Sequence, residues 1–330
     1  MRKTRITLHF PSRVTIDSHN STKIVRAIIY AYSLLYGKEE TDNLINEEFA
    51  TTDLLYWAQR GEDKDKEIYF YPKPIHSKKL SKELGNSQYT RLKTYKKITF
   101  VSESIIKDYY DKMLSFLRGE NNVIVKNKLA FLENEHINII RKFSKKAYNM
   151  LPRIRTGNEN TSQEFFFVPE QWIGNGGLYF ELVYDKEAIF QKIKTAIYFL
   201  EDRGIGKKIS SGDGNFKIKK VENLPSNKNE DKSDLKLLLS HWIPSQNDIN
   251  KGIIPVYYSL IKYQPIMQKV DLISPREAFP HKTIHMITSG SIVSSTSSIP
   301  LIIGKNVEIN HENEPKNIVW GRAVTHPISI

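Results

Sequence analysis

A glycine-rich segment in the second half of the chain has the composition of a ligand-binding loop. It runs from Gly204 to Gly214 and reads Gly-Ile-Gly-Lys-Lys-Ile-Ser-Ser-Gly-Asp-Gly. Glycines let the backbone adopt positive φ angles and approach a ligand closely, so that successive N–H groups can point at one phosphate. Lysine ammonium groups and serine hydroxyls would complete an anion site. The candidate phosphate-binding residues are therefore Gly204, Gly206, Lys207, Lys208, Ser210, Ser211, Gly212 and Gly214.

The elements on either side of this segment distinguish it from nucleotide-binding loops. A Walker or Rossmann loop follows a strand and opens a helix, so that the helix N-terminus faces the phosphate. Here a helical pattern comes first, from about residue 186 to 201, and a strand-like pattern follows. The segment also lacks a Gly-Lys-Ser/Thr ending and the GxGxxG spacing. The pattern disfavours an NTPase or a dehydrogenase and leaves a flexible turn as the alternative.

The charge of the chain points to a polyanionic partner. There are 49 Lys and Arg against 37 Asp and Glu, a net charge of +12, which attracts nucleic acid. The 17 Tyr and 15 Phe offer rings on which unpaired bases could stack, although most should lie in the core. RNA or DNA is therefore the expected ligand.

The absence of cysteine narrows the chemistry further. With no Cys in 330 residues, disulfides, thiolate nucleophiles and cysteine-based zinc sites are excluded, and no metal or cofactor is indicated. The longest apolar run, Ala27 to Tyr36, is about half of what a membrane span needs. The first residues lack the pattern of a signal peptide. We therefore expect a cytoplasmic protein with no membrane partner.

Hydrophobic periodicity predicts an α+β fold in which the same order of strands and helices occurs twice. Residues 6–10 alternate like a strand, and residues 24–35 repeat at helical spacing before Gly37, where the helix should end. A strand at 67–71 and a helix at 105–117 follow, which is half of a ferredoxin-like βαββαβ unit. After a break near residue 150 the order restarts, with strands at 164–169 and 177–184 and the helix at 186–201. Further strands are expected at 235–242, 253–263, 283–293 and 319–330.

We therefore expect two tandem ferredoxin-like (RRM-like) domains, residues 1–150 and 151–330. Between the elements of the first lies a basic segment, residues 76–97, that includes Arg91 and Lys93 and contains few apolar residues. It is interpreted as a basic hairpin that projects onto RNA. A solvated loop is the alternative.

Several motifs together resemble the RAMP superfamily of CRISPR proteins, and within it the Cas5 group of type III effector complexes. The family's loop resembles G-I-G-G-K/R-x-S-S-G-x-G-x-F, and Gly204 to Phe216 matches most positions, with Lys207 in place of a glycine. Residues 69–74, Tyr-Phe-Tyr-Pro-Lys-Pro, are similar to a second family motif. The Tyr36-Gly37, Pro152-Arg153 and Trp320-Gly321-Arg322-Ala323 segments also fit, so the resemblance covers nearly the whole chain.

The resemblance implies a non-catalytic subunit that binds the 5′ handle of the CRISPR RNA with two RRM-like domains and a thumb, here residues 76–97. It implies two protein partners, the large polymerase-type Cas subunit and the first backbone RAMP subunit. The glycine-rich loop would hold phosphates. Further candidate RNA-binding residues are Lys23, Arg26, Lys73, Arg91, Lys93, Arg153 and Arg155.

An endoribonuclease is the alternative function. Backbone RAMP subunits cut RNA with an aspartate in the loop after the first strand, and processing RAMP proteins often use a histidine. Asp17 and His19 lie in such a loop, where a general base could activate a 2′-hydroxyl. Short polar residues also favour loops and helix caps for local reasons. A general RNA-binding protein outside CRISPR is the third possibility.

Overall fold

The computed structural model of the chain describes most of its length and leaves out several loops. The described residues are 1–11, 20–59, 67–75, 89–120, 122–126, 128–135, 149–155, 164–170, 176–206, 214–225, 234–264, 266–268, 278–280, 283–309 and 317–329. They form a mixed α+β fold with one large sheet and a second, smaller sheet.

The first strand lies in the interior of the large sheet. Strand β1 (Arg2–His9) pairs antiparallel with β10 (Gly176–Tyr184) on one side and β11 (Lys217–Leu224) on the other. Strand β3 (Leu55–Gln59) and the short β2 (Phe49–Thr51) both pair with β10. Because successive side chains alternate between faces, Ile6 and Leu8 enter one core while Arg5 and Thr7 face the other way.

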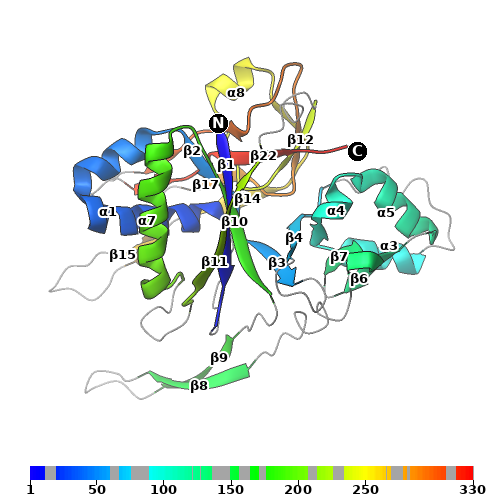
Figure 1. The fold of residues 1–330 in the computed structure, drawn as a ribbon, viewed down its shortest axis with the longest axis horizontal. Coiled ribbons are helices and arrows are strands. Elements are labelled where there is room, and N and C mark those ends of the chain that lie inside the picture. The colour runs from blue at the N-terminus through cyan, green and yellow to red at the C-terminus, as the bar shows by residue number, and fades with distance from the viewer. Residues whose placement is uncertain are drawn as a thin grey trace.

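Two helices cover the Ile6 face of the sheet. Helix α1 (Ser21–Asn46) and helix α7 (Glu187–Arg203) lie on the same side of β1 and β10, as Figure 1 shows. Both bury an apolar stripe against β1 and β10, and the stripe of α7 is Phe190, Ile193, Ala196, Ile197 and Leu200. The expected end at Gly37 is a kink instead, with φ +83°, and the helix continues to Asn46. Among the described residues, no helix has the length and apolar composition that a membrane span requires.

These elements form one βαββαβ unit. Its strand order is β11-β1-β10-β3, which is 4-1-3-2 when the strands are numbered within the unit. The predicted division at residues 150 and 151 is therefore not where the sheet divides, because β1 pairs with two strands from beyond it. Helix α7, expected in a second unit, completes the first one. Long-range strand pairing of this kind cannot be read from local periodicity.

The sheet continues on the far side of β3 into a helical region. The next strands are β4 (Glu67–Pro72), β5 (Phe100–Ser102), β7 (Leu129–Leu132), which leads into a short 3-10 turn (Glu133–Glu135), and β6 (Val123–Lys126). Beside them lie helices α3 (Tyr89–Lys97), α4 (Glu103–Ile106) and α5 (Tyr109–Arg118). Residues 89–97 of the expected hairpin are thus helical, anchored by buried Tyr95, whose hydroxyl lies 3.0 Å from that of Tyr109. Residues 76–88 lie outside the described residues.

A five-stranded sheet covers the other face of the large one. Its order is β13 (Ile254–Tyr257), β18 (Ile292–Ser294), β12 (Leu235–Leu238), β22 (Ala323–Pro327) and β19 (Ile302–Ile303). Leu237 and Val324 from this sheet share a core with Tyr179 and Val183 of β10. The strands expected in this half are confirmed. Among the described residues from 234 onward there is one helix, the short α8 (Gln246–Asn250). A ferredoxin-like unit has two helices, so a complete second unit stays a prediction.

Four two-stranded ladders complete the fold. They are β14 (Leu260–Tyr263) with β17 (Ile284–Ile287), β15 (Ile266–Gln268) with β16 (Ala278–Pro280), β20 (Val307–Ile309) with β21 (Asn317–Val319), and β8 (Asn149–Arg155) with β9 (Glu164–Glu170). Figure 1 draws the β8–β9 ladder just beyond the lower ends of β1 and β11, outside both sheets.

Candidate nucleic-acid interface

The glycine-rich loop leaves the fold through a closed neck. The Gly204 N–H donates to the Leu200 carbonyl at 2.7 Å, and the Ile205 N–H donates to the Gly214 carbonyl at 3.0 Å. Gly204 and Gly214 have φ angles of +84° and +79°. A Cβ added at Gly214 would lie 2.0 Å from the Ile205 carbonyl oxygen, so only glycine fits there. The neck confirms that this segment joins a helix to a strand.

The lysines and serines of the glycine-rich loop come between Gly206 and Gly214 in the sequence. Lys207, Lys208, Ser210, Ser211 and Gly212 fall in residues 207–213, outside the described part of the chain. Gly206, with φ +125°, is exposed at its near edge. Their role as phosphate ligands stays a prediction.

The neck is fixed beside the end of the first strand. Phe216 is buried, and its ring centroid lies 6.0 Å from that of Phe10. In the strand register His9 pairs with Lys217. Since Phe10 is followed by the segment that holds Asp17 and His19, that segment starts next to the glycine-rich loop. Asp17 and His19 themselves lie outside the described residues.

Strand β10 begins at the same end of the sheet. Trp57 Nε1 donates to the Leu8 carbonyl at 2.8 Å, and this bond crosses Gly177. A Cβ at Gly177 would lie 2.1 Å from that carbonyl oxygen, so the position requires glycine. The chain that returns from β9 therefore enters the sheet beside the other two loops. The described ends of three loops, at Phe10, Gly176 and Gly214, therefore lie at one end of the sheet.

Basic side chains at this end were missed by the sequence analysis. Arg203 is exposed one residue before Gly204, and its guanidinium carbon lies 5.2 Å from the centre of the Phe199 ring. Lys217 is exposed on β11, with Nζ 3.7 Å from Glu201 Oε1. Their positions in the sequence could have identified them, because Arg203 directly precedes Gly204 and Lys217 directly follows Phe216.

Lys23 and Arg26 lie in the first two turns of α1. The Lys23 N–H donates to Asn20 Oδ1 at 3.1 Å, and the Ser21 N–H donates to Asp53 Oδ1 at 2.7 Å. A carboxylate of the protein itself thus occupies this helix N-terminus. Arg26 is exposed.

Asp53 also faces His241 of the second sheet, with Nδ1 3.3 Å from Oδ1. Burial alone would lower the pKa of His241, but attraction to Asp53 and the hydrogen bond with it outweigh burial and raise that pKa. The Asp53 carboxylate therefore joins α1 to the second sheet.

Lys73 and Arg91 have structural contacts in the α3–α5 region. Lys73 Nζ donates to the Tyr95 carbonyl at 3.0 Å and lies 4.4 Å from the centre of the Tyr95 ring. Burial lowers the pKa of Lys73 to about 8. Arg91 Nη1 donates to the Phe116 carbonyl at 2.9 Å, at the end of α5. Lys93 is exposed on α3. These three residues lie in the region of the Tyr95 core, not in the α1–α7 core beneath the glycine-rich loop.

Arg153 and Arg155 lie on β8. Their backbone partners in β9 are Phe166 and Glu164. The structure thus places them on a ladder that, within the described residues, pairs with no other strand.

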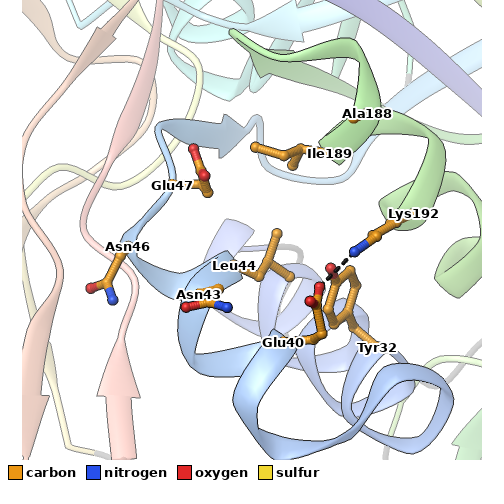
Figure 2. Close-up of a pocket in the computed structure, with 9 residues that line it drawn as sticks. All are labelled: Tyr32, Glu40, Asn43, Leu44, Asn46, Glu47, Ala188, Ile189 and Lys192. Carbon is orange, nitrogen blue, oxygen red and sulfur yellow. Dashed lines mark hydrogen bonds and ion pairs between the residues drawn. The ribbon is translucent and has the colours of Figure 1, made fainter.

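A cavity of about 480 Å³ lies between the second half of α1 and the start of α7. In Figure 2, Lys192 reaches from α7 to Glu40 on α1, and Glu47 lies at the far rim. Because Ala188 and Ile189 line it, the cavity is at the opposite end of α7 from Gly204. Its lining combines charged, amide and apolar side chains and includes the Lys192–Glu40 ion pair. No group of three or more His, Cys, Asp or Glu among the described residues could hold a metal ion.

Comparisons with known proteins identify relatives over nearly the whole chain. No protein-family model matches it. The CRISPR system protein Csm4 of Methanocaldococcus jannaschii is 28% identical, over 89% of this chain and 82% of that protein. A chain from the crystal structure of a Csm3–Csm4 subcomplex of the type III-A CRISPR-Cas interference complex covers both chains completely, with a TM-score of 0.66 and 22% identity. One from a Csm1–Csm4 cassette in complex with cA4 covers 100% of this chain and 99% of that chain, with a TM-score of 0.60 and 14% identity. The chain is a homologue of Csm4.

Proposed function

We propose that this protein is the Csm4-type subunit of a type III CRISPR effector complex, in which it holds the 5′ handle of the CRISPR RNA without cutting RNA. It joins a Csm1-type large subunit to a Csm3-type backbone subunit, and it works in the cytoplasm. The proposal combines the relationship to Csm4 with the geometry at one end of the large sheet.

The closed neck of the glycine-rich loop is the observation that carries the RNA part. The hydrogen bonds of Gly204 and Gly214 hold the ends of the loop together, so the chain between them, with two lysines and two serines, leaves and re-enters the fold at one place. Glycine-rich segments with such a composition can offer backbone N–H groups and cations to one phosphate. Exposed Arg203 and Lys217 beside the neck add positive charge, in a chain whose net charge is +12. Single-stranded RNA is bound by this combination of phosphate neutralisation and stacking.

The β8–β9 ladder is the better candidate for the projecting hairpin. Residues 89–97 of the predicted thumb form a packed helix, whereas β8 and β9 pair with each other alone among the described strands. The ladder carries Arg153 and Arg155, and its return strand leads toward Gly176 at the loop end of the sheet. We therefore assign the thumb role to β8–β9.

The protein partners come from the solved relatives. One contains Csm3 with Csm4, and another contains Csm1 with Csm4. Both matches extend over the full length of this chain. A linking role between a Csm1-type and a Csm3-type subunit follows if the same contacts are made here.

The test is RNA binding with and without the handle. The purified protein, alone and assembled with its Csm1-type and Csm3-type subunits, is titrated with guide RNA that carries the 5′ tag, lacks it, or carries a scrambled tag. We expect at least tenfold tighter binding of the tagged guide. Equal affinities for all three RNAs would contradict handle recognition.

Incubation of the protein with target RNA tests the absence of catalysis. We expect no cleavage by this subunit. Cleavage that disappears in Asp17→Ala or His19→Ala would instead establish a nuclease.

A further inference from the structure

Residues 253–263 and 284–294 pair as the two arms of one long hairpin, whose outer edge is open among the described strands. Ile254 in β13 pairs with Ser294, and Tyr263 in β14 pairs with Ile284, so the two arms run antiparallel over this length. The Thr288 N–H donates to the Ser259 carbonyl at 3.0 Å and bridges the two ladders. The outer arm, residues 253–263, has no second partner strand among the described residues. A long open edge of this kind readily pairs with another chain.

Apolar side chains are concentrated along this arm. Six of the twelve exposed large apolar side chains in the described residues fall within residues 249–261. Ile254 and Leu260 are each 58% exposed, and Tyr258 is 50% exposed. The other three are Ile249, Val256 and Ile261. Soluble chains rarely leave so much contiguous apolar surface open, so the arm marks an interaction surface.

The side chains of this surface suit a protein better than RNA. Five of the six are aliphatic, and aliphatic groups offer bases neither a stacking face nor a hydrogen bond. A protein interface, by contrast, has an apolar centre and a polar rim. The rim here is basic, with exposed Lys251, Lys262 and His285.

Charge also argues against a second copy of the same chain. Between residues 249 and 264 there is no Asp or Glu, so a two-fold antiparallel contact through this edge would bring Lys251 of one copy toward Lys262 of the other. Like charges across an interface oppose association. The complementary surface is apolar and flanked by carboxylates.

We propose that the outer edge of residues 253–263 is the docking surface for the Csm1-type large subunit, which presents an apolar strand or face flanked by Asp and Glu. The assignment rests on the proposed function. In the proposed function the backbone subunit continues along the RNA from the glycine-rich loop, whose neck lies between α7 and β11. The first part of the edge, β13, belongs to the five-stranded sheet, and β14 continues it as a ladder with β17, whereas the neck of the glycine-rich loop leads into β11 of the large sheet. The edge is therefore available to the Csm1-type subunit, the partner that does not continue along the RNA.

The experiment compares charge substitutions on the edge with a matched substitution elsewhere. Ile254→Glu and Leu260→Glu place a carboxylate in the proposed interface. Leu34→Glu is the control, because Leu34 is 51% exposed on α1. Ile254→Thr and Leu260→Thr are milder variants that keep strand propensity if the Glu variants fold poorly. Each variant is checked by thermal unfolding and then mixed with the purified Csm1-type subunit, the Csm3-type subunit, or tagged guide RNA.

We expect both edge substitutions to weaken binding of the Csm1-type subunit more than tenfold, with binding of the Csm3-type subunit and of RNA unchanged and Leu34→Glu equal to wild type. If the edge variants bind the Csm1-type subunit as well as wild type does, the inference is wrong. The proposed function would still stand in that case, provided that the wild-type protein assembles with its partners. Selective loss of the Csm3-type subunit, of RNA, or of a wild-type homodimer would also overturn it. If the wild-type protein binds none of these partners, the proposed function itself fails.

Discussion

Arg5 and Glu181 form a buried ion pair on neighbouring strands of the large sheet. Arg5 Nη2 lies 2.9 Å from Glu181 Oε1 and also donates to the Tyr71 hydroxyl at 2.8 Å. Lys3 Nζ lies 2.7 Å from the other carboxylate oxygen. The Glu181 side chain is fully buried, under the face covered by the second sheet. Two cations and a tyrosine thus hold one buried carboxylate where the two sheets meet.

Removing this carboxylate should destabilise the fold. In Glu181→Gln the side chain keeps its size, but Arg5 and Lys3 lose their counter-charge in a buried site. Breaking a buried pair from one side costs about 3–5 kcal/mol of unfolding free energy. Urea denaturation measures this loss.

The control for this prediction is the exposed Arg2–Glu187 pair, which joins β1 to the start of α7. Glu187→Gln should leave the denaturation midpoint unchanged, because solvent screens an exposed pair. Equal denaturation midpoints for Glu181→Gln and wild type would show that the buried ion pair does not stabilise the contact between the two sheets.

Stability should fall in acid through His326. Its ring stacks on Tyr71 at 5.0 Å between centroids, and its surroundings include Lys3, Arg5, Lys236 and Glu181. Burial, with repulsion from Lys3, lowers the pKa of His326 from 6.5 to about 3. As the pH falls from about 6.5 toward 3, the unfolded chain takes up a proton that the folded protein refuses, so stability is lost.

His326→Phe isolates this effect. Phenylalanine keeps the stacking on Tyr71 and cannot bind a proton, so its stability should vary less than that of wild type between pH 6.5 and 4.5. The stabilisation that Glu181 contributes is lost at lower pH, between pH 4.5 and about 2. Burial raises the pKa of Glu181, but attraction to Lys3 and Arg5 outweighs burial and lowers that pKa to about 2. His241, whose pKa is raised, acts in the opposite direction in both proteins, and its stabilisation is lost as the pH rises. Identical pH profiles for the two proteins would exclude His326.

Gly214→Ala should open the neck of the glycine-rich loop. The new Cβ would lie 2.0 Å from the Ile205 carbonyl oxygen, so the Ile205–Gly214 hydrogen bond must break or shift. We expect at least tenfold weaker binding of tagged guide RNA. Gly37→Ala is the control, since Gly37 has a similar φ of +83° but nothing within 4 Å of an added Cβ. Both variants carry backbone strain, and a comparable loss of RNA binding in both would assign the effect to strain alone.

Lys207→Ala combined with Lys208→Ala should weaken RNA binding and reduce its salt dependence. Two lysines on phosphates release about two counterions, so the slope of log affinity against log salt should become shallower by up to about two units. Lys38→Ala with Lys107→Ala, two exposed lysines elsewhere, should leave the slope unchanged. A slope that stays at the wild-type value in the loop variant would remove Lys207 and Lys208 from the site.

Arg91→Ala should lower stability and leave RNA affinity unchanged. Its guanidinium donates to the Phe116 carbonyl at the end of α5, and loss of that bond should cost about 1 kcal/mol. Lys93→Ala, two residues away and exposed, should leave stability unchanged. Thermal unfolding and RNA titration of both variants separate the two effects, and weaker RNA binding by Arg91→Ala would return it to the interface.

Local features of the fold were predictable because they depend on neighbours in sequence. Apolar spacing predicted α1 and α7, alternation predicted β1 and the strands after residue 234, and the glycines of residues 204–214 predicted a turn between a helix and a strand. The relationship to Csm4 was also expressed locally, in the order of short motifs. Gly37 shows the limit of such rules, since a glycine after an apolar stripe normally ends a helix and here kinks one.

The sequence by itself determined the helices α1, α5 and α7, most strands, the basic charge and the helix-to-strand glycine loop. Only the tertiary structure decided that β1 pairs with β10 and β11 across residue 150, which moves α7 into the first unit. It also decided that Lys73 and Arg91 bond to backbone carbonyls of the α3–α5 region, and that the outer edge of residues 253–263 pairs with no second strand among the described residues. The physical reason is that periodicity records which face of an element is buried, whereas its partner is set by contacts between residues far apart in the chain.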